Sequence, residues 1–249
     1  MLDYDKEADA YDASRGGAPR AAAAADAVTR LLPGNTRTLL DVACGTGTVT
    51  RRLATGLPGL RVTGVDAAPG MARRAVTRIP GAVVLADSRR LPFPDGEFDA
   101  VTSVWLLHLL DGPEDVRAVV TECARMLRPG GVYVTTVDKS AAHDVGSDID
   151  AVLAPRPRRP AQDRAERVGA YAAEHGLLPA GRARFLGHGQ GRSPRSTVAD
   201  LRRGWFTRLA PDDPLTAHFI TRLEALPEQE VPRGEPEFTL LAFRKPSAG

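Results

Sequence analysis

Four residues near position 40 have the types and spacing of a ligand-binding turn: Asp41, Ala43, Gly45 and Gly47. They lie between an apolar, β-prone run at 38–42 and a helix-like stretch at 48–57. A strand, a glycine turn and a helix in this order form the nucleotide site of open α/β sheets, at the carboxyl end of a strand. Residues without a large side chain let a ligand approach the backbone closely. The turn therefore predicts a bound nucleotide-like molecule.

Two further acids follow apolar strand-like runs. Asp66 comes directly after 61–65, about twenty residues beyond the glycine turn, where a carboxylate can accept both hydroxyls of a ribose. Asp87 follows the run 82–86. A dinucleotide fingerprint would require a third glycine at position 50, where Thr50 stands, and it gives no role to Asp41. A tight strand–helix turn without a ligand is the other alternative.

The sequence Asp41-Val42-Ala43-Cys44-Gly45-Thr46-Gly47 resembles motif I of the class I S-adenosylmethionine-dependent methyltransferases, with Ala43 in place of the commoner glycine. The resemblance is closest to small-molecule methyltransferases of the methyltransferase-11 type and covers roughly residues 4–137. Three other segments carry it: Tyr4-Asp5-x-x-Ala8-x-x-Tyr11-Asp12, Leu91-Pro92-Phe93-Pro94-Asp95-x-x-Phe98-Asp99 and Leu127-Arg128-Pro129-Gly130-Gly131.

The resemblance implies that the chain binds S-adenosyl-L-methionine, with no metal. It places Tyr11 and Arg15 on an N-terminal lid near the methionine end of the cofactor, and Asp66 on the ribose. It places Asp87 on the adenine amine. Asp41 either orders the turn or reaches the cofactor through water. The remaining implied cofactor contacts are Ala43, Gly45, Gly47, Ala67, Met71, Ser88 and Val104.

Hydrophobic periodicity predicts alternating strands and helices, and hence an α/β fold with helices on both faces of the sheet. The resemblance makes this a doubly wound, Rossmann-like sheet of seven strands, mostly parallel, with an antiparallel last strand. The predicted strands are 38–42, 61–65, 82–86, 98–104, 131–137, 182–188 and 237–244. The predicted helices are 4–13, 19–32, 48–57, 69–78, 114–127, 161–175, 196–209 and 214–226.

We expect one domain over residues 1–249. Lid helices occupy 1–34, the cofactor-binding core 35–137, an acceptor-binding elaboration 138–235 and the terminal strand 236–249. The run Ala154-Pro155-Arg156-Pro157-Arg158-Arg159-Pro160 cannot form a helix interior or a central strand. This run could make an anionic contact, but a solvated linker is the favoured interpretation.

Methyl transfer is an in-line displacement on an activated donor and needs no nucleophilic residue, so a general base is the only catalytic group to seek. Histidine is the first candidate for a base near neutral pH. His108, just beyond the strand 98–104, is the leading choice, and His143 is the second; His188 could line the pocket or only bend a loop. Trp105, Trp205 and Phe206 can wall an apolar acceptor site.

Composition narrows the class of partner. The net charge of +2 gives no argument for nucleic acid or an anionic membrane, and no apolar run approaches the ~20 residues of a membrane span. The polar N-terminus is unlike a signal peptide, and two cysteines form no disulfide framework. We therefore expect a cytoplasmic monomer or homodimer acting in small-molecule methylation, including secondary metabolism.

Hydroxyl and amine groups are the favoured acceptors, ahead of carbon. A nucleic-acid or protein methyltransferase is the alternative, but amino-directed members carry an Asn/Asp-Pro-Pro-Tyr turn where this chain has Ser103-Val104-Trp105-Leu106. A nicotinamide dehydrogenase is disfavoured by Thr50 and Asp41. A non-catalytic homologue that keeps the cofactor pocket stays open, because the transfer needs so little from the protein.

Overall fold

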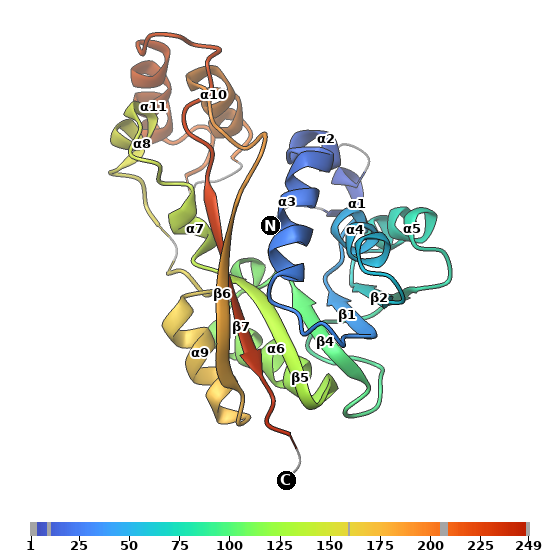
Figure 1. The fold of residues 1–249 in the computed structure, drawn as a ribbon. Helices are drawn as coiled ribbons and strands as arrows, with labels where there is room; N and C mark the ends of the chain where they lie inside the picture. Colours follow the sequence, from blue (N-terminus) through green and yellow to red (C-terminus); the bar gives the residue numbers. More distant parts are fainter. Residues whose placement is uncertain (1–3, 9–10, 159, 205–208, 248–249) are drawn as a thin grey trace.

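A seven-stranded sheet organises the chain, with strand order β3-β2-β1-β4-β5-β7-β6 in a computed structural model that describes residues 4–8, 11–158, 160–204 and 209–247 (Figure 1). Strands β1 to β5 run parallel, and β7 pairs antiparallel with both β5 and β6. The predicted α/β sheet with an antiparallel last strand is confirmed. The strands are β1 (Thr38–Val42), β2 (Arg61–Asp66), β3 (Val83–Leu85), β4 (Phe98–Ser103), β5 (Leu127–Val137), β6 (Leu178–Leu186) and β7 (Glu237–Arg244).

The order of the strands places the ligand site. From β1 the chain moves outward to β2 and β3, then returns to the other side of β1 as β4. The loops after β1 and β4 therefore diverge at the carboxyl edge and leave a crevice between them, which is where open α/β sheets bind ligands. Asp66 ends β2 at the same edge.

Helices cover both faces of the sheet because β1 is apolar on both of its sides. Leu39 packs into a cluster with α3 and α4, while Leu40 belongs to a cluster with α6 and α9, as expected for neighbours on a strand. The helices are α1 (Tyr4–Glu7), α2 (Tyr11–Ser14), α3 (Gly17–Thr29), α4 (Thr48–Gly56), α5 (Pro69–Arg78), α6 (Pro113–Met126), α7 (Lys139–Ala142), α8 (Asp148–Leu153), α9 (Ala165–Glu174), α10 (Pro194–Arg202) and α11 (Pro214–Glu224), with a short 3₁₀ turn η1 (Leu107–Leu109).

Two helices that the sequence analysis did not predict, α7 and α8, precede the run 154–160. Ser147 caps α8 in a reciprocal hydrogen-bonded box with Asp150. The apolar side of α8 packs with α10 and α11 into a third core, which Figure 1 shows beyond the ends of β6 and β7. Neither helix is long enough to show a hydrophobic period, so neither could be recognised from the sequence.

Other differences concern boundaries. The single helix predicted over 4–13 contains two short helices, α1 and α2, with residues 9–10 outside the described part. Strand β5 begins at Leu127 rather than 131, and β6 spans Leu178–Leu186 rather than 182–188. No helix among the described residues is long and apolar enough to cross a membrane.

Candidate functional site

The glycine turn after β1 is held by the carboxylate of Asp66. The Gly45 amide donates to one oxygen of Asp66 at 2.7 Å, and the Ala68 amide donates to the other at 2.9 Å. Burial raises the pKa of Asp66, and these amide bonds act in the opposite direction. The carboxylate therefore fixes the turn relative to the end of β2, and each oxygen keeps a lone pair for a ligand.

The three small residues of the turn have different roles. Ala43, Gly45 and Gly47 all have left-handed backbone, with φ of 60°, 57° and 76°. A Cβ built on Gly45 would meet nothing within 4 Å, so this position opens onto the cavity. A Cβ on Gly47 would lie 3.0 Å from the Cα of Ala75. Gly47 thus permits close packing of α4 on α5, and it does not line the cavity, contrary to its expected place in the ligand site.

Asp41 ties three elements together beneath the turn. Its buried carboxylate accepts from the Thr50 hydroxyl at 2.6 Å and from the Thr102 hydroxyl at 2.8 Å, which joins β1 to α4 and β4. Burial raises the pKa of Asp41 to about 6, against the effect of the two hydroxyls. These bonds favour the turn-ordering role among the two that the sequence left open.

The short N-terminal helices lie over the turn. Asp12 on α2 accepts from the hydroxyls of Thr46 at 2.6 Å and Thr48 at 3.2 Å, and pairs with Arg78 of α5 at 2.5 Å. Asp5 on α1 accepts from the Gly70 amide at 2.5 Å. These contacts hold the predicted lid in place, and sequence analysis did not predict this role of Asp12.

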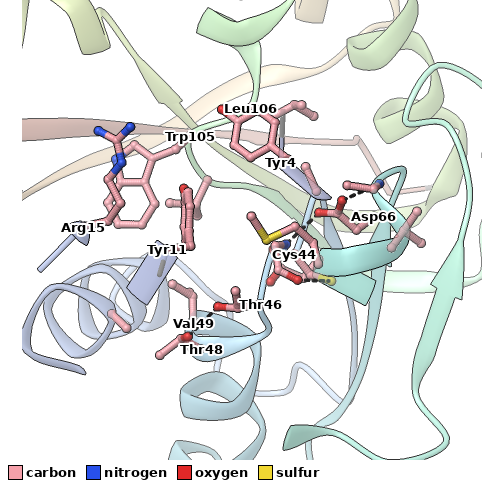
Figure 2. A pocket seen from close by; sticks show the side chains of 18 of the residues that line it. Tyr4, Tyr11, Arg15, Cys44, Thr46, Thr48, Val49, Asp66, Trp105 and Leu106 are labelled. Carbon is pink, nitrogen blue, oxygen red and sulfur yellow. Dashed lines mark hydrogen bonds between the residues drawn. The ribbon is translucent and has the colours of Figure 1, made fainter. Parts of the chain in front are cut away.

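A cavity of about 230 Å³ lies between the lid and the carboxyl ends of β1, β2 and β4. The next hollow, beside His143, has about 10 Å³, which is scarcely the volume of one water molecule. Figure 2 shows Arg15, Tyr11 and Trp105 on one side of the larger cavity and Asp66 with Cys44 on the other. The lining residues are Tyr4, Tyr11, Asp12, Arg15, Gly17, Arg20, Ala21, Asp41, Ala43, Cys44, Gly45, Thr46, Thr48, Val49, Val65, Asp66, Ala67, Ala68, Met71, Ala86, Ser88, Val104, Trp105, Leu106 and Leu109.

Most of the residues predicted for the cofactor meet in this cavity. Asp87 does not, because its carboxylate is 47% exposed and makes a double contact with Arg89, which lowers its pKa. Ser88, the next residue, does line the cavity. No group of three or more His, Cys, Asp or Glu side chains suited to a metal occurs in the described part of the chain.

Neither candidate base reaches the cavity. Burial, followed by the charge of Lys139, lowers the pKa of His108 well below its usual range, and its Nδ1 is buried without a hydrogen-bond partner. His143 lines the small second hollow with its ring against Phe238, and burial lowers its pKa to about 2. His188 lines neither hollow. The sequence predicted these histidines from their position after strands, and that position does not determine whether a side chain lines the cavity.

Trp105 is the predicted aromatic residue that does line the cavity. Its φ of 60° is rare for a bulky side chain, and its amide donates to the Thr136 hydroxyl at 3.0 Å. The ring packs on Phe185 and Phe238, which fixes its orientation. The other two predicted wall residues, Trp205 and Phe206, lie outside the described residues.

Sequence reasoning missed Arg20. This side chain is 6% exposed and lies in the cavity wall with its guanidinium carbon 3.4 Å from the centre of the Trp105 ring. The sequence signal that could have found it is a single arginine before a run of alanines, in a helix whose buried face contains no acid to pair with it.

Comparison with known proteins identifies the family. Residues 40–135 match the family model described as "Methyltransferase domain". A ubiquinone/menaquinone biosynthesis C-methyltransferase of Desulfotalea psychrophila is 36% identical over 96 residues, 37% of this chain and 38% of that protein. Human methyltransferase-like protein 27 is 34% identical over 181 residues, 68% of this chain and 66% of that protein. The chain spans less than half the length of several other curated methyltransferases that it matches.

Solved structures show the same fold at lower identity. A Haloferax volcanii methyltransferase, in complex with the Trm112 methyltransferase activator, has a TM-score of 0.61 at 19% identity, with 100% of both chains covered. Geranyl diphosphate C-methyltransferase from Streptomyces coelicolor A3(2), in complex with Mg²⁺, geranyl diphosphate and S-adenosyl-L-homocysteine, has a TM-score of 0.52 at 18% identity. That match covers 90% of this chain and 78% of the other.

Proposed function

The chain belongs to the class I S-adenosylmethionine-dependent methyltransferases, and we propose that it transfers the methyl group of S-adenosylmethionine to a hydroxyl or amine of a small organic molecule. The observation that carries this proposal is the cavity bounded by the glycine turn, Asp66 and the lid. It is the larger of the two hollows, and the family's motif residues line it.

The residues present fit the cofactor. Open space beside Gly45 admits a ligand against the backbone, and the remaining lone pairs of Asp66 suit the two ribose hydroxyls. Met71, Ala67 and Ser88 would surround the adenine. Tyr11 and Arg15 would hold the methionine end from the lid, with Ala43 and Val104 along the chain between the two ends. Asp87 remains a proposed adenine contact only if its pairing with Arg89 opens.

The bound cofactor supplies an activated methyl group on a sulfonium, so the protein's main task is to hold the two reactants in line. Orientation at near-attack distance can contribute ~7–11 kcal/mol toward the barrier. The described cavity wall contains no imidazole, so we expect an acceptor that needs little help in losing its proton. The acceptor would lie on the Trp105 side, beneath the lid, with the elaboration 138–235 behind it.

A carbon acceptor is the second candidate, because the Desulfotalea relative is named as a C-methyltransferase. The two candidates differ in product. With a labelled methyl donor, a methyl group transferred to oxygen or nitrogen is released from the product when the ether, ester or amine is cleaved. A labelled methyl group on carbon stays in the product under the same treatment.

Calorimetric titration with S-adenosylmethionine, S-adenosylhomocysteine and NADH tests the cofactor assignment. We expect both adenosyl ligands to bind and NADH to give no heat. Asp66→Asn should weaken S-adenosylhomocysteine at least tenfold, because it replaces a charged acceptor of hydroxyl hydrogen bonds. The matched control, Asp95→Asn, changes an acid that is 79% exposed and lies outside the cavity wall. Binding of NADH with no response to either adenosyl ligand would overturn the proposal.

A further inference from the structure

Basic side chains from three separate segments converge behind Trp105. Arg15 and Arg20 come from the lid and α3, Lys139 begins α7, and Arg192 precedes the cap of α10. We call these four residues the cation cluster. The loop before Arg192 packs on the lid, because a Cβ built on Gly189 would lie 2.8 Å from the Cα of Gly16, the residue after Arg15. Ala142 of α7 packs in the same apolar cluster as Trp105, whose ring lies under Arg20. Burial first, and then the charges of Arg15, Arg20 and Arg192, lower the pKa of Lys139 to about 7.

Carboxylates near the cation cluster are few and already engaged. Asp163 offsets part of the charge of Lys139, and one of its oxygens accepts from the Lys139 amide at 2.8 Å. Asp12, beside Arg20, is engaged by Arg78 and two threonine hydroxyls. Asp150, beside Arg192, accepts from the backbone amides of Val145 and Ser147. These three acids therefore share their oxygens between the cation cluster and other donors.

Arg20 illustrates the consequence for a buried cation. Its side chain is more than nine-tenths buried, one terminal nitrogen donates to the Arg15 carbonyl at 3.1 Å, and its Nε is buried without a hydrogen-bond partner. Burial lowers the pKa of its guanidinium to about 10. A buried cation with an unsatisfied donor is costly, and such groups in native proteins call for an explanation such as a ligand. Arg20 lines the cavity, so an anion entering the cavity can reach it.

The cofactor cannot supply the missing negative charge. S-adenosylmethionine carries one carboxylate, one ammonium and one sulfonium, so its binding adds a positive charge to the site. Its carboxylate would satisfy Arg15 of the lid, and Arg20 would still lie in the cavity wall, with Lys139 and Arg192 outside the wall.

We propose that the methyl acceptor is an organic anion, whose carboxylate or phosphate group binds at Arg20 while its apolar part contacts Leu106 and Leu109. Lys139 and Arg192, outside the cavity wall, add positive charge to this end of the site. The claim that the anion is the methyl acceptor rests on the proposed function, whereas the claim that an anion binds at this site does not. Leu106 and Leu109 line the cavity next to Trp105, so the site joins a charged end to an apolar wall.

Calorimetry with three probes tests the anion site: benzoate, its neutral isostere benzamide, and inorganic phosphate. Each is titrated into the protein with and without saturating S-adenosylhomocysteine. We expect one of the two anions to bind at one site and benzamide to bind at least tenfold more weakly than that preferred anion. Tighter binding of benzoate than phosphate would identify a carboxylate, and the reverse order would identify a phosphate.

Two variants of the cation cluster and a matched control complete the test. Lys139→Gln and Arg192→Gln should each weaken the preferred anion at least fivefold and leave S-adenosylhomocysteine binding within twofold. Arg222→Gln, an exposed position on α11, should change neither. Circular dichroism checks that each variant is folded, and either folded variant suffices.

Equal affinity for benzamide and the preferred anion, no anion binding at millimolar concentration, or unchanged affinity in the variants would overturn the anionic acceptor. Loss of S-adenosylhomocysteine binding with anion binding retained would instead refute the cofactor proposal and leave the anion site standing. The two failures are therefore distinguishable.

Discussion

Replacing Asp41 by asparagine should make the protein less sensitive to rising pH. Asp41 is buried, and burial raises its pKa from 3.8 to about 6. A carboxyl group whose pKa is higher in the folded than in the unfolded chain binds its proton better when folded. Stability is therefore greatest below the unfolded pKa and is lost as pH rises through the folded one.

The magnitude follows from the shift. One pKa unit corresponds to ~1.4 kcal/mol, so a rise of about two units costs about 3 kcal/mol at neutral pH. Linkage places about 2 kcal/mol of this between pH 4.5 and 7.5. Asparagine does not titrate and keeps one oxygen for the hydroxyls of Thr50 and Thr102. The difference in unfolding free energy between Asp41→Asn and the parent should thus move by about 2 kcal/mol in favour of the variant over that interval.

Urea unfolding followed by circular dichroism at pH 4.5, 6 and 7.5 measures this difference. Parallel pH profiles for the parent and Asp41→Asn would refute the reasoning, because they would mean that Asp41 titrates normally in the fold. Asp41→Ala is the control for the hydrogen bonds: it leaves both hydroxyls without their acceptor and should lose ~1–3 kcal/mol per hydroxyl at every pH. If Asp41 only orders the turn, Asp41→Asn should bind S-adenosylhomocysteine within about threefold of the parent.

Three further predictions concern the turn and the lid. Ala43→Gly should raise the melting temperature by about 2 °C, because glycine removes ~0.5–1 kcal/mol of left-handed strain; a lower melting temperature would contradict this. Gly47→Ala should lose at least ~2 kcal/mol of stability, because its new Cβ would meet Ala75. Gly45→Ala should lose only ~1 kcal/mol of stability but bind S-adenosylhomocysteine at least tenfold more weakly. If the two variants had equal effects on denaturation and on binding, the two glycines would not differ in role. Asp12→Asn should speed dissociation of S-adenosylhomocysteine about tenfold in stopped-flow measurements, and an unchanged rate would show that its contacts do not hold the lid.

The cofactor half of the site follows from the sequence because each of its parts is local. Asp41, Gly45 and Asp66 lie at the carboxyl ends of consecutive strands, and a parallel sheet brings such ends to one edge whatever the rest of the chain does. The apolar runs that mark those strands are strong signals, and β1 and β7 have the predicted boundaries. Gly47 was assigned to the ligand only because spacing cannot tell a glycine that faces a ligand from one that packs against a helix.

The acceptor half could not be predicted in the same way, because its parts meet through long-range contacts. Arg20, Lys139 and Arg192 are separated by more than fifty residues at each step, and they come together only where β7 pairs between β5 and β6. His108 is a second example in which the sequence could not predict whether a side chain reaches the site. Its position after β4 correctly predicted the edge of the sheet, but the imidazole is buried outside the cavity wall, which Leu106 and Leu109 line instead.

Residues 11–20 connect the two halves of the site. Asp12 holds this segment on the glycine turn, and Arg20, beyond the left-handed pair Gly16-Gly17, carries the segment's contact with Trp105. A segment that contacts both ligands makes the binding of each depend on the position that the other favours. Any factor by which S-adenosylhomocysteine tightens benzoate must then equal the factor by which benzoate tightens S-adenosylhomocysteine. The two sets of titrations measure these factors independently. A shared factor above one that is lost in Asp12→Asn would assign the coupling to the lid, and a factor that survives in this variant would assign it to direct contact between the two ligands.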